Sequence, residues 1–111
     1  MNVNNKKFRA IANKEGLSSQ ETVFHYFQNK NVITGTYKGG QVLEGFVVGR
    51  QTENNKIELL FQCVTTDHEL LSGESTGTII INKDSKLELM FDWSWLNGDR
   101  SGGKSHYIEI E

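Results

Sequence analysis

The sequence predicts an all-β protein, a single eight-stranded antiparallel up-and-down barrel that occupies residues 1–111. Three observations predict it. Apolar and polar residues alternate in residues 87–95, strand-like segments follow one another through short turns, and no segment has a convincing helical period. The composition agrees, because 11 glycines can supply tight turns and the absence of proline leaves the ladders uninterrupted.

The alternation is clearest in residues 87–95, which read Leu-Glu-Leu-Met-Phe-Asp-Trp-Ser-Trp. A strand turns every second side chain to the same face, so Trp93 and Trp95 should share an apolar face with the preceding Leu and Phe residues. Each tryptophan can bury roughly 150–250 Å². The two indoles, just before a turn at Asn97 and Gly98, are therefore either part of the core or the wall of a ligand pocket.

The predicted strands, in order, are residues 8–13, 22–27, 32–38, 41–50, 57–66, 69–81, 87–95 and 105–111. β-Branched and aromatic residues favour the second strand, and Gly39-Gly40 marks a tight turn between the third and fourth. The other links are polar or glycine-rich, including a loop at residues 99–104. We expect the sixth strand to bend at Gly73 or Gly77. Short links favour antiparallel neighbours, and closure removes exposed edges. A two-sheet sandwich is the alternative.

The fourth strand should turn Leu43, Gly45 and Val47 inward, which leaves Val42, Glu44, Phe46 and Val48 outside. Three apolar residues on a free surface would be unusual, so we expect a homo-oligomer that forms through the barrel exterior. On the second and eighth strands, alternation with apolar neighbours predicts that His25 and His106 point into the interior.

Charge and cysteine content exclude several classes of function. A formal net charge of −2 gives no basic excess for nucleic acid or an anionic membrane. No apolar run indicates a signal peptide or a transmembrane span, so we expect a cytoplasmic protein. Cys63 has no partner for a disulfide and lies in an apolar run, which favours a core residue over a nucleophile. The histidines lack metal-like spacing, so we expect no metal and no other cofactor.

Residues 33–37, Ile-Thr-Gly-Thr-Tyr, followed by residues 42–46, Val-Leu-Glu-Gly-Phe, resemble the third and fourth strands of avidins and streptavidin. Trp93 shortly before a glycine turn resembles their seventh strand. The resemblance implies an avidin-like or calycin-like barrel with a ligand at one end. It implies that Asn13 and Tyr37 bind the ureido oxygen of a ligand and that Trp93 and Trp95 line its rings. Phe61 would supply a third aromatic residue.

The sequence departs from this family at several positions. Leu71 stands where the family has a tryptophan, and Glu69 falls near a family threonine. No aspartate matches the carboxylate that accepts a ureido N–H, since alternation with two isoleucines predicts that Glu109 and Glu111 point outward. The family's long loop after the third strand is reduced to two glycines. These departures argue against tight binding of biotin.

The chain also resembles small bacterial proteins labelled N-acetylglutamate synthase, in residues 5–9, in Phe24-His25-Tyr26 and in Trp93-Ser94-Trp95. That resemblance implies a small-molecule acyltransferase. The sequence lacks the strand-to-helix pyrophosphate loop of the usual acetyl-CoA-dependent enzymes.

We therefore expect non-covalent binding of a small, partly polar molecule at the open end of the barrel. The expected walls are Phe61, Trp93 and Trp95; the expected polar groups are Asn13, Tyr37, Glu69 and His106. Two alternatives stay open. One is an enzyme, either the acyltransferase or a barrel that uses His106 and Glu69 as an acid–base pair. The other is a structural barrel with a filled interior.

Overall fold

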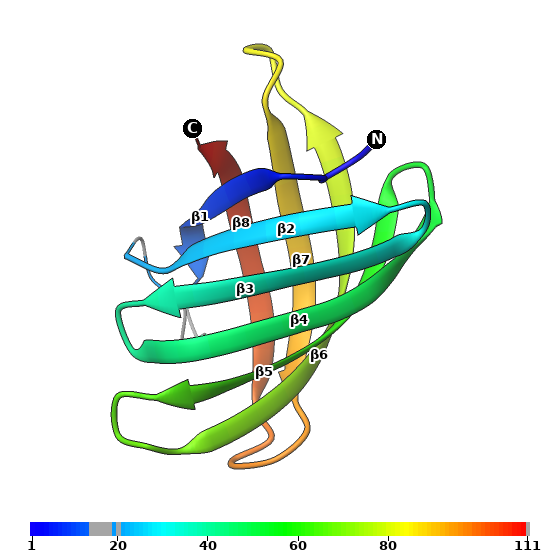
Figure 1. Ribbon diagram of the computed structural model, residues 1–111. Helices are drawn as coiled ribbons and strands as arrows, with labels where there is room; N and C mark the ends of the chain where they lie inside the picture. Colours follow the sequence, from blue (N-terminus) through cyan, green and yellow to red (C-terminus); the bar gives the residue numbers. More distant parts are fainter. Residues whose placement is uncertain (14–18, 20, 111) are drawn as a thin grey trace.

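The structure, a computed structural model, describes residues 1–13, 19 and 21–110, and the side chains of Ala12 and Asn13 lie outside this description. The strands are β1 (Lys6–Asn13), β2 (Val23–Asn29), β3 (Val32–Gly39), β4 (Val42–Glu53), β5 (Lys56–Thr65), β6 (Leu70–Ile81), β7 (Leu87–Trp95) and β8 (Gly102–Ile110). Each strand pairs with its neighbours in sequence, and β1 pairs with β8, so the sheet closes into a barrel (Figure 1). The predicted all-β, eight-stranded antiparallel barrel is confirmed, and the sandwich alternative is excluded. Within the described ranges, no helix could cross a membrane.

The bend expected at Gly73 or Gly77 does not interrupt pairing in β6. The ladders with β5 and β7 run through both glycines without a register shift. A Cβ atom added at Gly77 would lie 2.4 Å from the Phe91 ring, and one at Gly73 would lie 2.5 Å from the Phe61 ring. The glycines therefore leave space for aromatic rings of the neighbouring strands. Besides bends, such close approach is a common reason for glycine within a sheet.

The alternation of β7 has the predicted result. Leu87, Leu89, Phe91 and Trp93 are buried inside the barrel, whereas Met90 and Asp92 are exposed. The eighth strand is longer than predicted, because it begins at Gly102 instead of residue 105. Gly102 allows this, since a Cβ atom there would lie 2.6 Å from the carbonyl oxygen of Trp93. Only a glycine fits so close to the backbone of β7.

The predictions for the inner faces of β2 and β8 were wrong. Phe24 and Tyr26 are buried inside, so His25 faces outward, where its Nε2 lies 2.8 Å from Asn5 Oδ1. On β8 the buried residues are Ser105 and Tyr107, which places His106 on the outer side. Both strands carry apolar side chains on both faces, so alternation alone did not decide which face is inside.

The β4 strand contains a bulge that the sequence did not predict. The register with β5 shifts between Val42 and Glu44. Val42 is consequently buried and Leu43 is 46% exposed, the reverse of the prediction for these two residues. Beyond the bulge the predicted faces are correct, with Gly45 and Val47 inside and Phe46 outside. A bulge adds one residue to one strand and so reverses the faces on its far side.

The most deeply buried apolar side chains lie in the half of the barrel near the N-terminus. Phe8, Ile33, Ile57, Ile79 and Leu89 are each at most 1% exposed. The first residues of the chain close this end. Val3 is buried and its N–H donates to Gln28 Oε1 at 3.0 Å, while Gln28 Nε2 donates to Gln51 Oε1. The amide side chains satisfy backbone groups that would otherwise be buried without partners.

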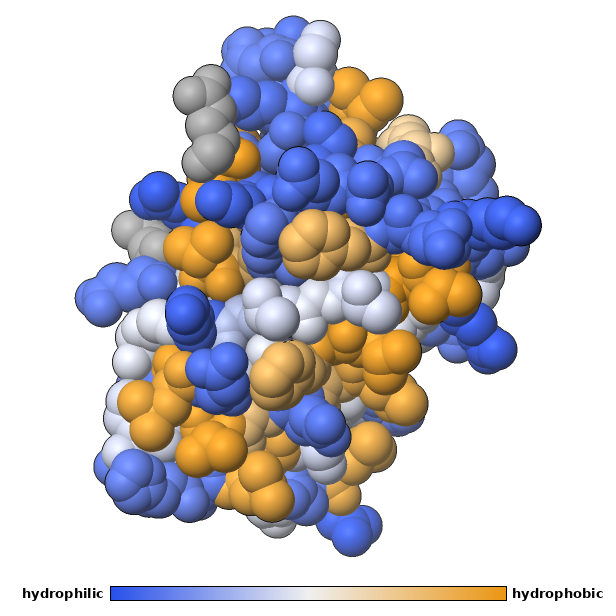
Figure 2. Space-filling model, viewed as in Figure 1, coloured by the Kyte–Doolittle hydropathy of each residue, from blue (hydrophilic) through white to orange (hydrophobic). Residues whose placement is uncertain are grey.

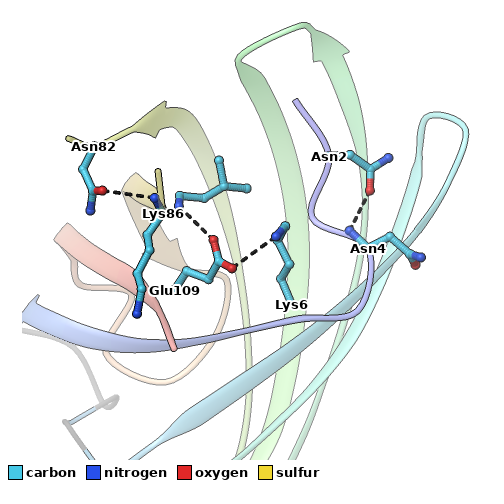
Figure 3. A network of polar contacts seen from close by, with 7 residues as sticks. Asn2, Asn4, Lys6, Asn82, Lys86 and Glu109 are labelled. Carbon is cyan, nitrogen blue, oxygen red and sulfur yellow. Dashed lines mark hydrogen bonds and ion pairs between the residues drawn. The ribbon is translucent and has the colours of Figure 1, made fainter. Parts of the chain in front are cut away.

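A carboxylate also lies at this end, contrary to the prediction that Glu109 points outward; Glu111 lies outside the described residues. Glu109 accepts hydrogen bonds from the Leu87 N–H at 2.9 Å and from Lys6 Nζ at 3.1 Å (Figure 3). Partial burial acts to raise the pKa of Glu109. The Leu87 N–H and the charges of Lys6 and Lys86 outweigh it, so this pKa lies below its usual range.

Replacing Glu109 by glutamine should therefore destabilise the protein by about 1 kcal/mol at neutral pH, because the charge-assisted bond to Lys6 is lost. A lowered folded-state pKa gives stability that is present above the unfolded pKa of roughly 4.3 and lost as the pH falls through the folded pKa. Urea unfolding of wild type and Glu109→Gln from pH 7 to pH 3 should show the two curves converging in acid. A constant difference would mean that the Glu109 charge is not responsible.

Candidate functional site

Four of the predicted site residues gather at the end of the barrel away from the N-terminus. Tyr37 lies near the end of β3, Phe61 lies on β5, and Trp93 and Trp95 end β7. Tyr37 and Trp93 are buried, and Phe61 and Trp95 are half-buried. We call these four residues the aromatic end. The β3–β4, β5–β6 and β7–β8 turns surround it, and Figure 1 shows these turns on the opposite side of the barrel from the N-terminus.

Three rings of the aromatic end, those of Phe61, Trp93 and Trp95, contact one another edge to face. The centroids of Trp93 and Trp95 are 5.7 Å apart at an interplanar angle of 67°, and those of Phe61 and Trp95 are 5.5 Å apart at 69°. Tyr37 stacks on Phe24 at 4.7 Å and 14°. Such edge-to-face and offset arrangements suit the ring quadrupoles. Both tryptophans are thus on the inner side of β7, as the alternation predicts.

Two glycines fix the position of these rings. A Cβ atom at Gly45 would lie 2.5 Å from Cζ of Tyr37, and a Cβ atom at Gly73 would lie 2.5 Å from Cζ of Phe61. Each ring therefore lies across the neighbouring strand at a point where no side chain stands. The space beside the Gly45 backbone is therefore occupied by the Tyr37 ring.

Two polar atoms of the aromatic end are buried without a hydrogen-bond partner among the described residues, Tyr37 Oη and Trp93 Nε1. An indole N–H can only donate, and a phenol can donate or accept. Leaving such groups unpaired inside a protein costs about 1–3 kcal/mol each. Most buried polar groups have partners, so two orphaned groups at the same end of the barrel need a physical explanation.

The Tyr37 hydroxyl is neutral. Burial raises the pKa of Tyr37 far above its ordinary value, and the neighbouring Cys63 raises it further. Burial likewise raises the pKa of the Cys63 thiol, although the nearby Tyr37 hydroxyl acts to lower it. The two groups influence each other, but their geometry does not make a hydrogen bond. A buried, neutral thiol fits the predicted core role of Cys63 better than that of a nucleophile.

No charged side chain among the described residues points into this end. Lys38, Glu44, Asp67, Glu69 and Lys104 are all exposed, as are the charged residues of the β7–β8 turn. The polar groups that face inward are uncharged hydroxyls, such as Ser75 and Ser105, which are 8% and 6% exposed. Ser75 pairs directly with Trp93 across β6 and β7. Ser75 was not among the predicted site residues, although alternation with Leu71, Gly73 and Gly77 places it on the inner face.

The remaining predicted polar residues do not join the aromatic end. Glu69 is exposed in the turn before β6, where its N–H donates to Thr65 Oγ1 at 3.1 Å. His106 lies outside the barrel, and its Nε2 is 2.5 Å from Glu88 Oε1. The proposed acid–base pair of His106 and Glu69 is therefore not formed. The backbone of Asn13 ends β1, but its side chain lies outside the described residues.

The described residues contain no group of three or more His, Cys, Asp or Glu side chains that could hold a metal ion. The site is accordingly a cluster of aromatic rings with a few neutral hydrogen-bonding groups. Such a site can bury a flat or partly apolar molecule and orient it by a small number of hydrogen bonds. It offers no general base and no activated nucleophile among the described residues that line it.

Comparison with known proteins agrees with this geometry. A family model described as "Avidin-like protein" matches residues 1–110. No curated protein and no solved structure matches the chain. The family match supports the first resemblance seen in the sequence, and nothing in the comparisons supports the resemblance to N-acetylglutamate synthase. Nearly the whole chain is covered, and its eight strands close into an antiparallel barrel. The chain belongs to the avidin-like family.

Proposed function

We propose that the protein binds a small, partly polar molecule without covalent chemistry at the aromatic end of the barrel. The observation that carries the proposal is the pair of orphaned donors, Tyr37 Oη and Trp93 Nε1. A ligand with a hydrogen-bond acceptor, such as a carbonyl oxygen, would satisfy them and recover the free energy lost by their burial. Membership of the avidin-like family supports small-ligand binding within the barrel.

The lining of the site favours a particular ligand chemistry. The buried part of the ligand should be uncharged, because no charged side chain described at this end turns inward to balance an ion. It should also be flat or apolar enough to pack against the edge-to-face rings of Phe61, Trp93 and Trp95. A charged group on the ligand would have to stay near the exposed turns.

The same geometry argues against tight biotin binding. Leu71 is half-buried and packs against the core, on the inner face of β6. An aliphatic side chain therefore stands where the avidin resemblance implies a tryptophan wall. Neither enzymatic alternative, the acyltransferase or the acid–base barrel, finds support in the site, since His106 pairs with Glu88 outside the barrel and burial raises the pKa of the Cys63 thiol.

Native mass spectrometry of protein purified from its own host tests this proposal. We expect a mass excess of a small molecule that is retained under native conditions and lost on denaturation. The released molecule should be uncharged over its buried part and should carry a hydrogen-bond acceptor. If the protein carries no such molecule, and a panel of neutral carbonyl compounds leaves its tryptophan fluorescence unchanged, the proposal fails.

A further inference from the structure

Charge is divided unevenly along this chain, although the overall net charge is small. Residues 1–39 contain six Lys and Arg residues and two Glu residues, whereas residues 40–111 contain six Lys and Arg residues and twelve Asp and Glu residues. The net charge of −2 therefore averages a basic part and a more strongly acidic part, and it does not describe each face of the barrel. Such asymmetry within one chain is typical of proteins whose basic part contacts an anionic partner.

The basic part forms one continuous surface, the outer side of β1, β2 and β3. We call it the β1–β3 face, and its outward residues are Lys7, Arg9, Val23, His25, Phe27, Thr34, Thr36 and Lys38. The ladders place Arg9, Val23 and Lys38 side by side in one row, and Lys7 and His25 stand in the next row. Figure 2 shows mainly hydrophilic surface where Figure 1 has β1 and β2.

The cations of the β1–β3 face have no acidic residue within their own strands, since β1, β2 and β3 contain no Asp or Glu. Lys7, Arg9 and Lys38 are exposed, and none of them forms an ion pair with a described residue. By contrast, Arg50 on β4 pairs with Glu58 at 3.4 Å. Cations that lack an internal counter-charge attract an anionic partner to the face that carries them.

Two aromatic rings lie among these cations. The ring centroids of His25 and Phe27 are 4.4 Å apart at an interplanar angle of 37°, and His25 Nε2 lies 2.8 Å from Asn5 Oδ1. Phe27 is 42% exposed, so part of its ring is open to a ligand. Aromatic rings beside cations bind single-stranded nucleic acids in many proteins, because every base has a π face that can stack on them.

We propose that the β1–β3 face binds single-stranded nucleic acid, with phosphates on the cations and bases on the rings of His25 and Phe27. Lys7 and Arg9 are two residues apart on the same side of β1, and they therefore stand about 6.8 Å apart. Successive phosphates of an extended single strand have a similar spacing. A strand that lies along β1 turns its bases toward β2, where His25 pairs with Lys7. Lys38, across β2 from Arg9, is placed for a third phosphate.

The β1–β3 face fits a single strand better than it fits other anionic partners. The barrel is closed, so an acidic peptide finds no free edge at which to add as a further strand. An anionic membrane finds little apolar surface to bury, because the outward residues of β3 beside Phe27 and His25 are Thr34 and Thr36. A duplex keeps its bases stacked on one another, where the rings of this face cannot reach them.

Fluorescence anisotropy with labelled oligothymidine and oligouridine of about 12 nucleotides tests the proposal. Wild type should bind at low salt with a dissociation constant of ~10⁻⁵ M or below. The logarithm of the association constant should fall with the logarithm of salt concentration at a slope of about −2, the value for three phosphate contacts. Binding of either oligonucleotide supports the proposal, and the tighter one identifies DNA or RNA as the preferred partner. A wild type that binds neither overturns it.

A double substitution tests the role of the cations. Lys7→Gln with Arg9→Gln should weaken binding ~10-fold or more and make the salt slope shallower by about 1.4. Arg50→Gln with Lys56→Gln is the matched control, because it removes the same charge from the exposed ends of β4 and β5. All four side chains are exposed or partly exposed, so both variants should fold, as far-ultraviolet circular dichroism can show. Equal effects of the two double variants would overturn the proposal.

A substitution without a change of charge separates stacking from electrostatic attraction. Phe27→Ala should weaken binding of the oligonucleotide ~10-fold and leave the salt slope unchanged, because it removes a stacking ring and no cation. Leu60→Ala, which truncates a 53% exposed residue of β5, should leave the affinity unchanged. If Phe27→Ala binds as tightly as wild type, no base stacks there and the proposal fails. It also fails if a duplex or polyglutamate of equal charge binds as tightly as the single strand.

Discussion

Replacing Tyr37 by phenylalanine should weaken ligand binding while leaving the empty protein as stable as wild type or slightly more stable. The two effects have opposite signs because the hydroxyl has no partner in the structure. Removing an orphaned buried hydroxyl relieves a penalty of about 1–3 kcal/mol, whereas the ligand loses a hydrogen bond of comparable value. The phenylalanine ring can keep the stacking on Phe24 at 4.7 Å. Affinity should fall roughly tenfold to a hundredfold.

The measurement compares wild type and Tyr37→Phe in two assays. Native mass spectrometry gives the fraction of protein that retains the co-purified molecule, and thermal unfolding after its removal gives the stability of the empty barrel. Trp93→Phe should lose ligand in the same way, since it removes the second orphaned donor. Met90→Leu is the control, because Met90 is exposed on the outer face of the same strand and lies outside the aromatic end. Equal retention in all variants would show that the orphaned donors do not hold the ligand.

Replacing Phe8 by alanine should destabilise the barrel by about 3–5 kcal/mol, the usual cost of removing a buried phenylalanine ring. Phe8 is completely buried and contacts the Tyr26 ring edge to face at 5.6 Å. It also lies on β1, which forms the shortest described ladder of the barrel with β2. In the described residues β1 pairs with β2 through four residue pairs, Lys6 to Arg9 with Val23 to Tyr26. The loss is a large part of the 5–15 kcal/mol that typically stabilises a domain.

Equilibrium unfolding in urea measures this effect, with the fluorescence of the two tryptophans as the signal. Phe27→Ala is the matched control. Phe27 lies on β2 as a neighbour of Tyr26 but is 42% exposed, so the same substitution should change stability by about 0.5 kcal/mol or less. If Phe8→Ala and Phe27→Ala had similar effects, the β1–β2 junction would not depend on the buried ring.

The aromatic end could be predicted from the sequence to a large extent. The alternation of residues 87–95 placed Trp93 and Trp95 on one inner face, and the short turns between strands made an antiparallel barrel the simplest closed arrangement. Tyr37 and Phe61 followed from the avidin resemblance. These predictions depend on local patterns of period two, which are strong wherever one face of a strand is apolar and the other is polar.

Other parts of the site could not be predicted, because both faces of the strands concerned look alike. In β8, Ile108 and Ile110 alternate with Tyr107 and Glu109, and in β2, Val23 and Phe27 alternate with Phe24 and Tyr26. Pairing across the sheet decides which set faces inward. As a result, His106 lies outside the barrel beside Glu88, and Glu109 lies at the end of the barrel beside Lys6. Whether Tyr37 Oη and Trp93 Nε1 find hydrogen-bond partners depends on neighbours from several strands. No local sequence pattern could therefore predict that both lack one.

The sequence by itself determined the class of fold, the approximate positions of the strands and the aromatic character of one end. The tertiary structure alone decided which faces of β2 and β8 are inside, where β4 bulges, and which buried donors have no partner. The physical reason is the range of the interactions. Alternation and turn formation act within a few residues, whereas ladder register and hydrogen-bond satisfaction are set by strands that come together only when the barrel closes.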